Sequence, residues 1–133
     1  MNMAAVVVHS AEDVRRTLDA AAGSPVMVIS AEDGAAVIGA DFFAAMVSEG
    51  AARAGAPAPE AWLDCGNLPG HVMGALRHGC RRILFAGPSS ASKKLNDIAA
   101  QQGAVIASRP ADAFDLGHPV ADDAALAAYI RKV

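Results

Sequence analysis

Three side chains in this sequence are the first candidates for chemistry: Asp64, Cys65 and His9. Asp64 and Cys65 end one apolar run, and His9 follows another. A carboxylate at the end of a strand is partly buried, so its pKa can be adjusted for acid–base work. A cysteine attacks only as the thiolate, and a histidine can act as general acid or base beside either group. An enzyme that uses Asp64 or Cys65 with His9 is therefore one alternative for the function.

Asp64 and Cys65 also have structural interpretations. Aspartate commonly shapes a turn by accepting hydrogen bonds from nearby amides, here those of Gly66 and Asn67. Cysteine is among the most frequently buried residue types, so Cys65 can serve as a packed residue of a strand. The sequence favours these structural roles over the catalytic ones.

Residues 87–94, GPSSASKK, have the composition of an anion-binding turn. A strand that turns through glycine into a serine-rich helix presents free amides and hydroxyls. The segment resembles a P-loop, since Gly87 and Lys93 have the spacing of its first glycine and its lysine. It departs from that motif because Ser92 replaces the second glycine and Lys94 replaces the metal-binding hydroxyl. We expect a phosphate or carboxylate subsite, or ordinary serine capping, and no nucleoside triphosphatase.

The function that we favour from the sequence is binding of a small anionic ligand at one edge of a parallel sheet. In such sheets ligands bind beyond the carboxyl ends of the strands. The alternative outside catalysis is an interaction or oligomerisation module, in which an alanine-rich helix face makes a self-contact. The predicted ligand-binding residues are Ser10, Glu32, Asp33, Asn67, Gly87, Ser89 and Ser90.

We predict no metal and no cofactor. The histidines His9, His71, His78 and His118 show no HxH or HExxH spacing, and the GxGxxG fingerprint is missing after the first expected strand. A response-regulator receiver has a similar expected topology, with its phosphoacceptor where Asp64 stands. His9 and Ser10 occupy the place of its acidic pair, however, so we do not assign the chain to that family.

The elements that must position these residues are clearest over residues 61–87. Leu68, Val72 and Leu76 recur at i, i+4 and i+8, which predicts a helix between two short apolar strands. Gly79 stands where a left-handed residue ends such a helix. Two strands joined by a helical crossover lie parallel, so this stretch predicts a parallel α/β unit.

The rest of the chain repeats this alternation. We expect strands at residues 4–8, 26–29, 62–63, 83–85 and 104–107, and helices that begin near Ser10, Asp41, Ser89 and Ala124. Residues 35–40 are either a packed loop or an extra turn, and residues 109–122 are expected to be irregular. The predicted fold is a single α/β domain over residues 1–133, a three-layer doubly wound structure with a mostly parallel five-stranded sheet. The default strand order is the flavodoxin-like 2-1-3-4-5.

Composition limits the partners. A net charge of −3 over 133 residues argues against a general nucleic-acid binder, and no apolar run approaches the roughly 20 residues of a membrane span. Two cysteines are too few for a disulfide framework, which favours a cytoplasmic location. Of all residues 53% are hydrophobic, but many of these are alanine, so burying a face in a homo-oligomer is one way to complete the core.

Overall fold

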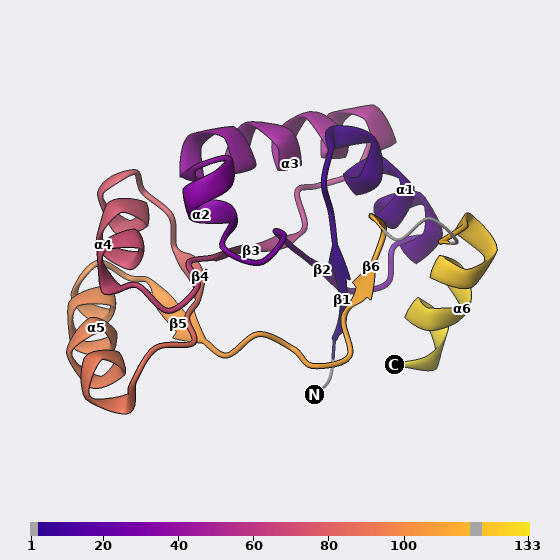
Figure 1. Ribbon diagram of the computed structural model, residues 1–133. Coiled ribbons are helices and arrows are strands. Elements are labelled where there is room, and N and C mark those ends of the chain that lie inside the picture. The colour runs from indigo at the N-terminus through magenta and orange to yellow at the C-terminus, as the bar shows by residue number, and fades with distance from the viewer. Residues whose placement is uncertain (1–2, 118–120) are drawn as a thin grey trace. The chain divides into compact units, whose positions relative to one another are not determined.

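The computed structural model describes residues 3–117 and 121–133 (Figure 1), and these residues form two compact units. The first unit contains residues 3–29, 44–61, 110–117 and 121–133. The second contains Ser30–Phe43 and Trp62–Arg109. His118 lies outside the described residues. Every strand pairing described within the units is parallel, and helices connect the strands, so the predicted α/β class is confirmed.

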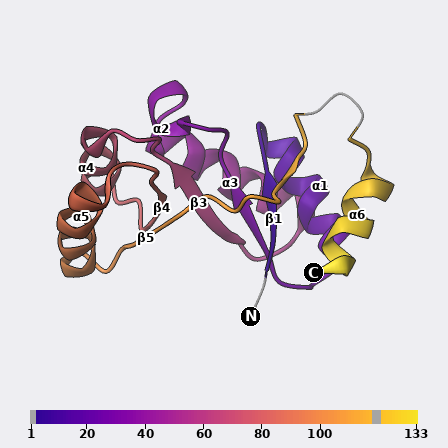
Figure 2. The same ribbon diagram turned by 60° about the horizontal axis from the view of Figure 1, so that its bottom comes forward.

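The first unit is built on β1 (Ala4–Val7), which lies between β2 (Val26–Ile29) and β6 (Phe114–Asp115). Val6, at 0% exposure, pairs with residues of both neighbours. Helices α1 (Ala11–Ala21) and α6 (Asp123–Lys132) lie side by side in both views (Figures 1 and 2). The helix that was expected to begin near Ser10 is present as α1, and Ser10 caps it, because the Asp13 amide donates to Ser10 Oγ at 3.1 Å. Buried valines and Leu126 form the core of this unit.

The second unit contains β4 (Arg82–Leu84), which pairs with β5 (Val105–Ala107) on one side and with the end of β3 (Glu60–Asp64) on the other. Asp64, Leu84 and Ala107 lie in one row across the three strands. Because the strands are parallel, the segments that follow this row emerge at one edge, the carboxyl edge of the second unit.

Helices α4 (Pro69–Arg77) and α5 (Ser89–Gln101) each begin after a strand at this carboxyl edge. They pack against each other, and α4 also contacts α2 (Gly34–Val37). The longest helix, α3 (Ala40–Ala54), follows α2. The ambiguous stretch at residues 35–40 is thus an extra helical turn rather than a loop, followed at once by the start of α3. Gly79 has φ +84°, as a residue that ends a helix in the left-handed region should.

The predicted strand order and strand number are wrong. In the order 2-1-3-4-5 the neighbour of β1 opposite β2 is β3, whereas here that neighbour is β6. The sixth strand lies in residues 109–122, which were expected to be irregular. Its two residues, Phe114 and Asp115, are too few to show an alternating pattern, so only the tertiary pairing with Val6 and Val7 reveals the strand.

Candidate functional site

Asp64 is the centre of a hydrogen-bonded network at the carboxyl edge of the second unit. It is the last residue of β3 and only 6% exposed. Its Oδ1 accepts hydrogen bonds from the amides of Asp33, at 2.9 Å, and Gly66, at 2.8 Å. Its Oδ2 accepts one from Nη1 of Arg109 at 2.9 Å. The hydrogen bond from the Gly66 amide is one of the two expected if Asp64 shapes the turn. The second was expected from the Asn67 amide, but the Asp33 amide makes it instead.

Arg109 is fixed by one nitrogen and leaves the others free. Its Nη1 donates to Oδ2 of Asp64 and to the carbonyl of Ser30, at 3.0 Å. Within residues 3–117 and 121–133, Nε and Nη2 of Arg109 have no hydrogen-bond partner. Every buried side-chain nitrogen in these residues does have a partner. These two donors therefore reach solvent, and the side chain is 23% exposed.

The position of Arg109 follows from the strand order. It comes two residues after β5, whereas Asp64 ends β3, and β4 lies between these two strands. The ion pair thus links the end of β3 to the segment after β5, across β4. The sequence places a basic residue after the fifth expected strand, but only the tertiary contact with Asp64 distinguishes Arg109 from other arginines.

A second carboxylate, Asp33, orients a histidine. Its Oδ1 lies 3.0 Å from Nδ1 of His71 on α4. The backbone of Asp33 has φ 55°, in the left-handed region that side chains other than glycine rarely adopt. Although Asp33 stands at the N-cap of α2, its side chain makes no capping bond there. The structure thus holds Asp33 in a strained conformation in which its carboxylate contacts His71.

The start of α5 offers exposed polar groups at the same edge. Pro88 is the N-cap and makes no side-chain capping bond, so the first amides of the helix have no such acceptor. Ser89 and Ser90 are exposed. Gly87 has a packing role, because a Cβ there would overlap the ring of Phe85.

Cys65 is held as a neutral thiol. It is 0% exposed, and its Sγ lies 3.6 Å from the carbonyl oxygen of His71. Burial raises the pKa of the Cys65 thiol to about 12, and the nearby Cys80, Asp64 and Asp33 act in the same direction. A thiolate is the form that attacks, so this environment opposes a role for Cys65 as nucleophile. Both cysteines of the chain are free.

His9 and Ser10 belong to the first unit. Nε2 of His9 lies 2.7 Å from Oδ1 of Asp115, so the residue after β1 is tied to β6. Ser10 is used as the cap of α1. The joint action of His9 with Asp64 or Cys65, which are in the other unit, stays a prediction, and so does ligand binding by Ser10.

Glu32 and Asn67 are exposed residues of the second unit. No hydrogen bond or ion pair involves their side chains within residues 3–117 and 121–133. Their side chains are available to a ligand at the carboxyl edge, but no contact in the structure favours them as ligand-binding residues over other exposed polar residues there. The side chains that the structure does bring together there are those of Ser30, Asp33, Asp64, His71 and Arg109.

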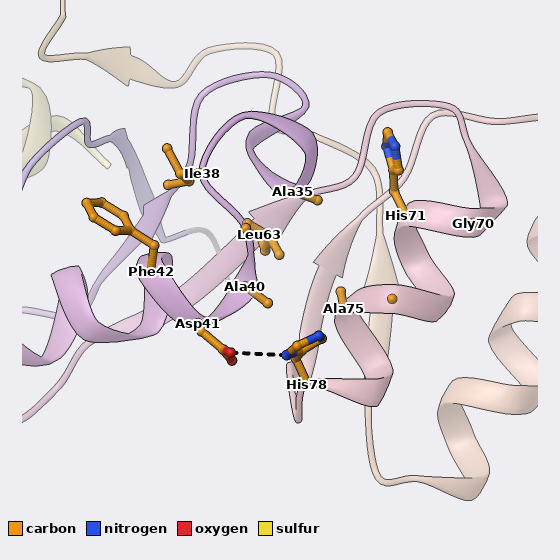
Figure 3. A pocket seen from close by; sticks show the side chains of 12 residues that line it. Ala35, Ile38, Ala40, Asp41, Phe42, Leu63, Gly70, His71, Ala75 and His78 are labelled. Carbon is orange, nitrogen blue, oxygen red and sulfur yellow. Dashed lines mark hydrogen bonds and ion pairs between the residues drawn. The ribbon is translucent and has the colours of Figure 1, made fainter.

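A cleft of about 390 Å³ lies beside this network in the second unit, between α2, the first turn of α3 and α4. Figure 3 shows its labelled side chains, with the Asp41–His78 contact drawn as a dashed line. Nδ1 of His78 lies 3.1 Å from Oδ2 of Asp41. His71 also lines the cleft, so each of its two histidines has its Nδ1 beside an aspartate.

No known protein family, curated protein or solved structure matches this chain. The functional argument therefore depends on the site itself. Residues 3–117 and 121–133 contain no cluster of three or more histidine, cysteine or carboxylate side chains arranged to hold a metal ion. No helix within those residues is long and apolar enough to cross a membrane.

Proposed function

We propose that the second unit binds a small anionic molecule at its carboxyl edge, with Arg109 supplying the charge. The observation that carries this proposal is the anchoring of Arg109 through Nη1, whereas Nε and Nη2 have no partner within residues 3–117 and 121–133 and reach solvent. A guanidinium offers its donors in a planar fork that matches a carboxylate or a phosphate. Since Asp64 and Ser30 already hold the side chain, a ligand gains two charge-assisted hydrogen bonds at a reduced entropic cost.

The start of α5 supports the same chemistry. The amino end of a helix carries a partial positive charge and free amides, and α5 begins at the carboxyl edge without a side-chain cap. The exposed hydroxyls of Ser89 and Ser90 add donors for anionic oxygens. Asp33 and Asp64 place negative charge nearby, so a ligand of low charge is favoured over a polyanion, which both would repel more strongly.

The test is titration calorimetry of the full chain with inorganic phosphate, acetate and oxalate. Arg109→Gln removes the charge, whereas Arg109→Lys keeps the charge but loses the planar pair of hydrogen-bond donors. The matched control is Arg81→Gln, an exposed arginine whose Nη1 donates to the carbonyl of Cys80. We expect saturable binding of at least one probe by the native protein and by Arg81→Gln, and loss of at least tenfold in affinity in Arg109→Gln.

Two results would overturn the proposal. One is the absence of saturable binding for all three anions at millimolar concentration. The other is equal affinity in the native protein and in Arg109→Gln, with circular dichroism showing that both are folded. Ligand binding also predicts a rise in stability of about 2.7 kcal/mol at a ligand concentration one hundred times the Kd.

The other functions expected from the sequence remain open proposals. The enzyme that uses Asp64 with His9 requires activity that is lost in Asp64→Asn. The oligomerisation module requires self-association, which sedimentation at micromolar concentration measures. We also propose a cytoplasmic location, which the two free cysteines support.

A further inference from the structure

The geometry points to a second ligand site, the cleft between α2, the first turn of α3 and α4. We propose that this cleft binds a small, planar, largely apolar molecule that carries a hydroxyl group, a phenol in its simplest form. The hydroxyl donates to Nε2 of His71, and the apolar body lies over Gly74. This proposal does not depend on the anion site at Arg109, because the hydrogen bond to the ligand is made by His71 and not by Arg109 or by the start of α5.

The size and lining of the cleft suit such a ligand. Its volume of about 390 Å³ is near the lower end of the roughly 300–1,000 Å³ typical of small-molecule sites. Leu63, Ala35, Ile38 and Phe42 supply apolar surface. Phe42 is 60% exposed, so an apolar molecule in the cleft would cover surface that is otherwise in contact with water.

The floor of the cleft contains space that the protein does not fill. His71, Gly74 and Ala75 are spaced i, i+3 and i+4, so they share one face of α4, and His78 is the C-cap of that helix. A Cβ added at Gly74 would meet no atom within 4 Å in the part of the chain that the structure describes. Gly74 does not have a positive φ, so its backbone conformation does not call for glycine. Glycine inside a helix is less favourable than alanine, and an occupant of the cleft gives a reason for glycine at this position.

His71, the polar side chain at one end of this floor, determines which functional group of a ligand can hydrogen-bond there. Asp33 accepts through its carboxylate, so Nδ1 of His71 must carry the proton in the neutral ring. Nε2 then presents a lone pair, and within residues 3–117 and 121–133 it has no partner. A hydroxyl donor matches that lone pair, whereas a carboxylate does not. Of the two cleft histidines His71 is the more enclosed, with 30% of its side chain exposed against 59% for His78.

The probes are 4-ethylphenol and its methyl ether 4-ethylanisole, which has the same body without the donor. Calorimetry measures both affinities, and nitrogen-15 NMR of the histidine rings reports the state of Nε2. We expect the phenol to bind at least about fivefold more tightly than the ether, which is the factor that one hydrogen bond of about 1 kcal/mol gives. The Nε2 signal of His71 should shift on addition of the phenol and not of the ether.

Three variants locate the site. His71→Gln should abolish the preference for the phenol, while His9→Gln, a histidine also paired with an aspartate but in the first unit, should keep it. Gly74→Leu should fill the floor and remove binding of both probes, and Gly74→Ala should weaken it if the leucine variant does not fold. The proposal is overturned if neither probe binds, if the phenol and the ether bind equally to the native protein, or if a folded Gly74→Leu protein binds as well as the native one.

Discussion

Nη1 of Arg109 lies 2.9 Å from Oδ2 of Asp64, so the chain just beyond β5 is tied to the last residue of β3. The side chain of Asp64 is 8% exposed, and its other oxygen, Oδ1, accepts hydrogen bonds from two backbone amides. The carboxylate of Asp64 thus accepts hydrogen bonds from the three chain segments that follow β2, β3 and β5. This makes Asp64 a structural centre of the carboxyl edge, as well as the residue that anchors Arg109 for a ligand.

Replacing Asp64 should lower stability strongly. Asp64→Asn keeps the size of the side chain but puts an NH₂ group where only acceptors fit, and it leaves Nη1 of Arg109 without its charged partner. We expect the free energy of unfolding to fall by about 2–3 kcal/mol, as measured by urea denaturation. Asp97→Asn on α5 is the control, because Asp97 is exposed and makes no hydrogen bond or ion pair within residues 3–117 and 121–133. A loss for Asp64→Asn no larger than that of the control would contradict the structural role.

Cys65 should make the protein sensitive to alkali. Burial raises the pKa of its thiol from 9.0 to about 12 in the folded state, so above pH 9 the unfolded chain loses this proton before the folded one does. Stability from this group is complete below pH 9 and falls as the pH rises toward 12. Urea denaturation at pH 8 to 11 should therefore show a steeper loss for the native protein than for Cys65→Ala. At neutral pH, a thiol reagent should modify Cys80 before Cys65; rapid modification of Cys65 would show that its thiol is not buried.

The sequence predicted the regular elements because their signals are local. Ser10 caps α1 through an amide three residues away, and Gly79 ends α4 with a positive φ. The sixth strand lacks such a signal, since Phe114 and Asp115 form a strand only by pairing with β1 more than a hundred residues earlier. Strand order failed for the same reason, because nothing local to β1 shows which strand lies beside it.

The same limit applies to the site. Asp64 is placed at the carboxyl edge by the end of its own strand, which the apolar run predicts. The contact between Asp33 and His71 joins residues 38 positions apart, and the contact between Asp64 and Arg109 joins residues 45 positions apart. Neither spacing forms a motif. Sequence reasoning therefore found the edge where polar residues gather, but not which of them are held in place.

Gly66 should tolerate a side chain less well than Gly79 does. Both have positive φ values, +62° and +84°, so alanine at either position is strained by about 1–2 kcal/mol. Only at Gly66 would the new Cβ also come within 3.0 Å of Oδ1 of Asp33, the oxygen that holds His71. We expect Gly66→Ala to lower the free energy of unfolding more than Gly79→Ala, and to shift the NMR signals of the His71 ring. Equal effects on stability with an unchanged His71 would rule out this close contact.

Two glycines in helices should respond to alanine with opposite signs. In α3, a Cβ at Gly50 would lie 2.6 Å from the carbonyl oxygen of Ala11 and would overlap Val14, so α1 and α3 must move apart to admit it. Gly50→Ala should lower the free energy of unfolding by about 1–3 kcal/mol despite the better helix propensity of alanine. In α4, Gly74→Ala adds its methyl group to open space and should raise the free energy of unfolding by up to about 1 kcal/mol. Urea denaturation of the two variants beside the native protein measures both changes. A stabilised Gly50→Ala would show that α1 and α3 do not approach so closely, and a destabilised Gly74→Ala would show that the floor of the cleft is already filled.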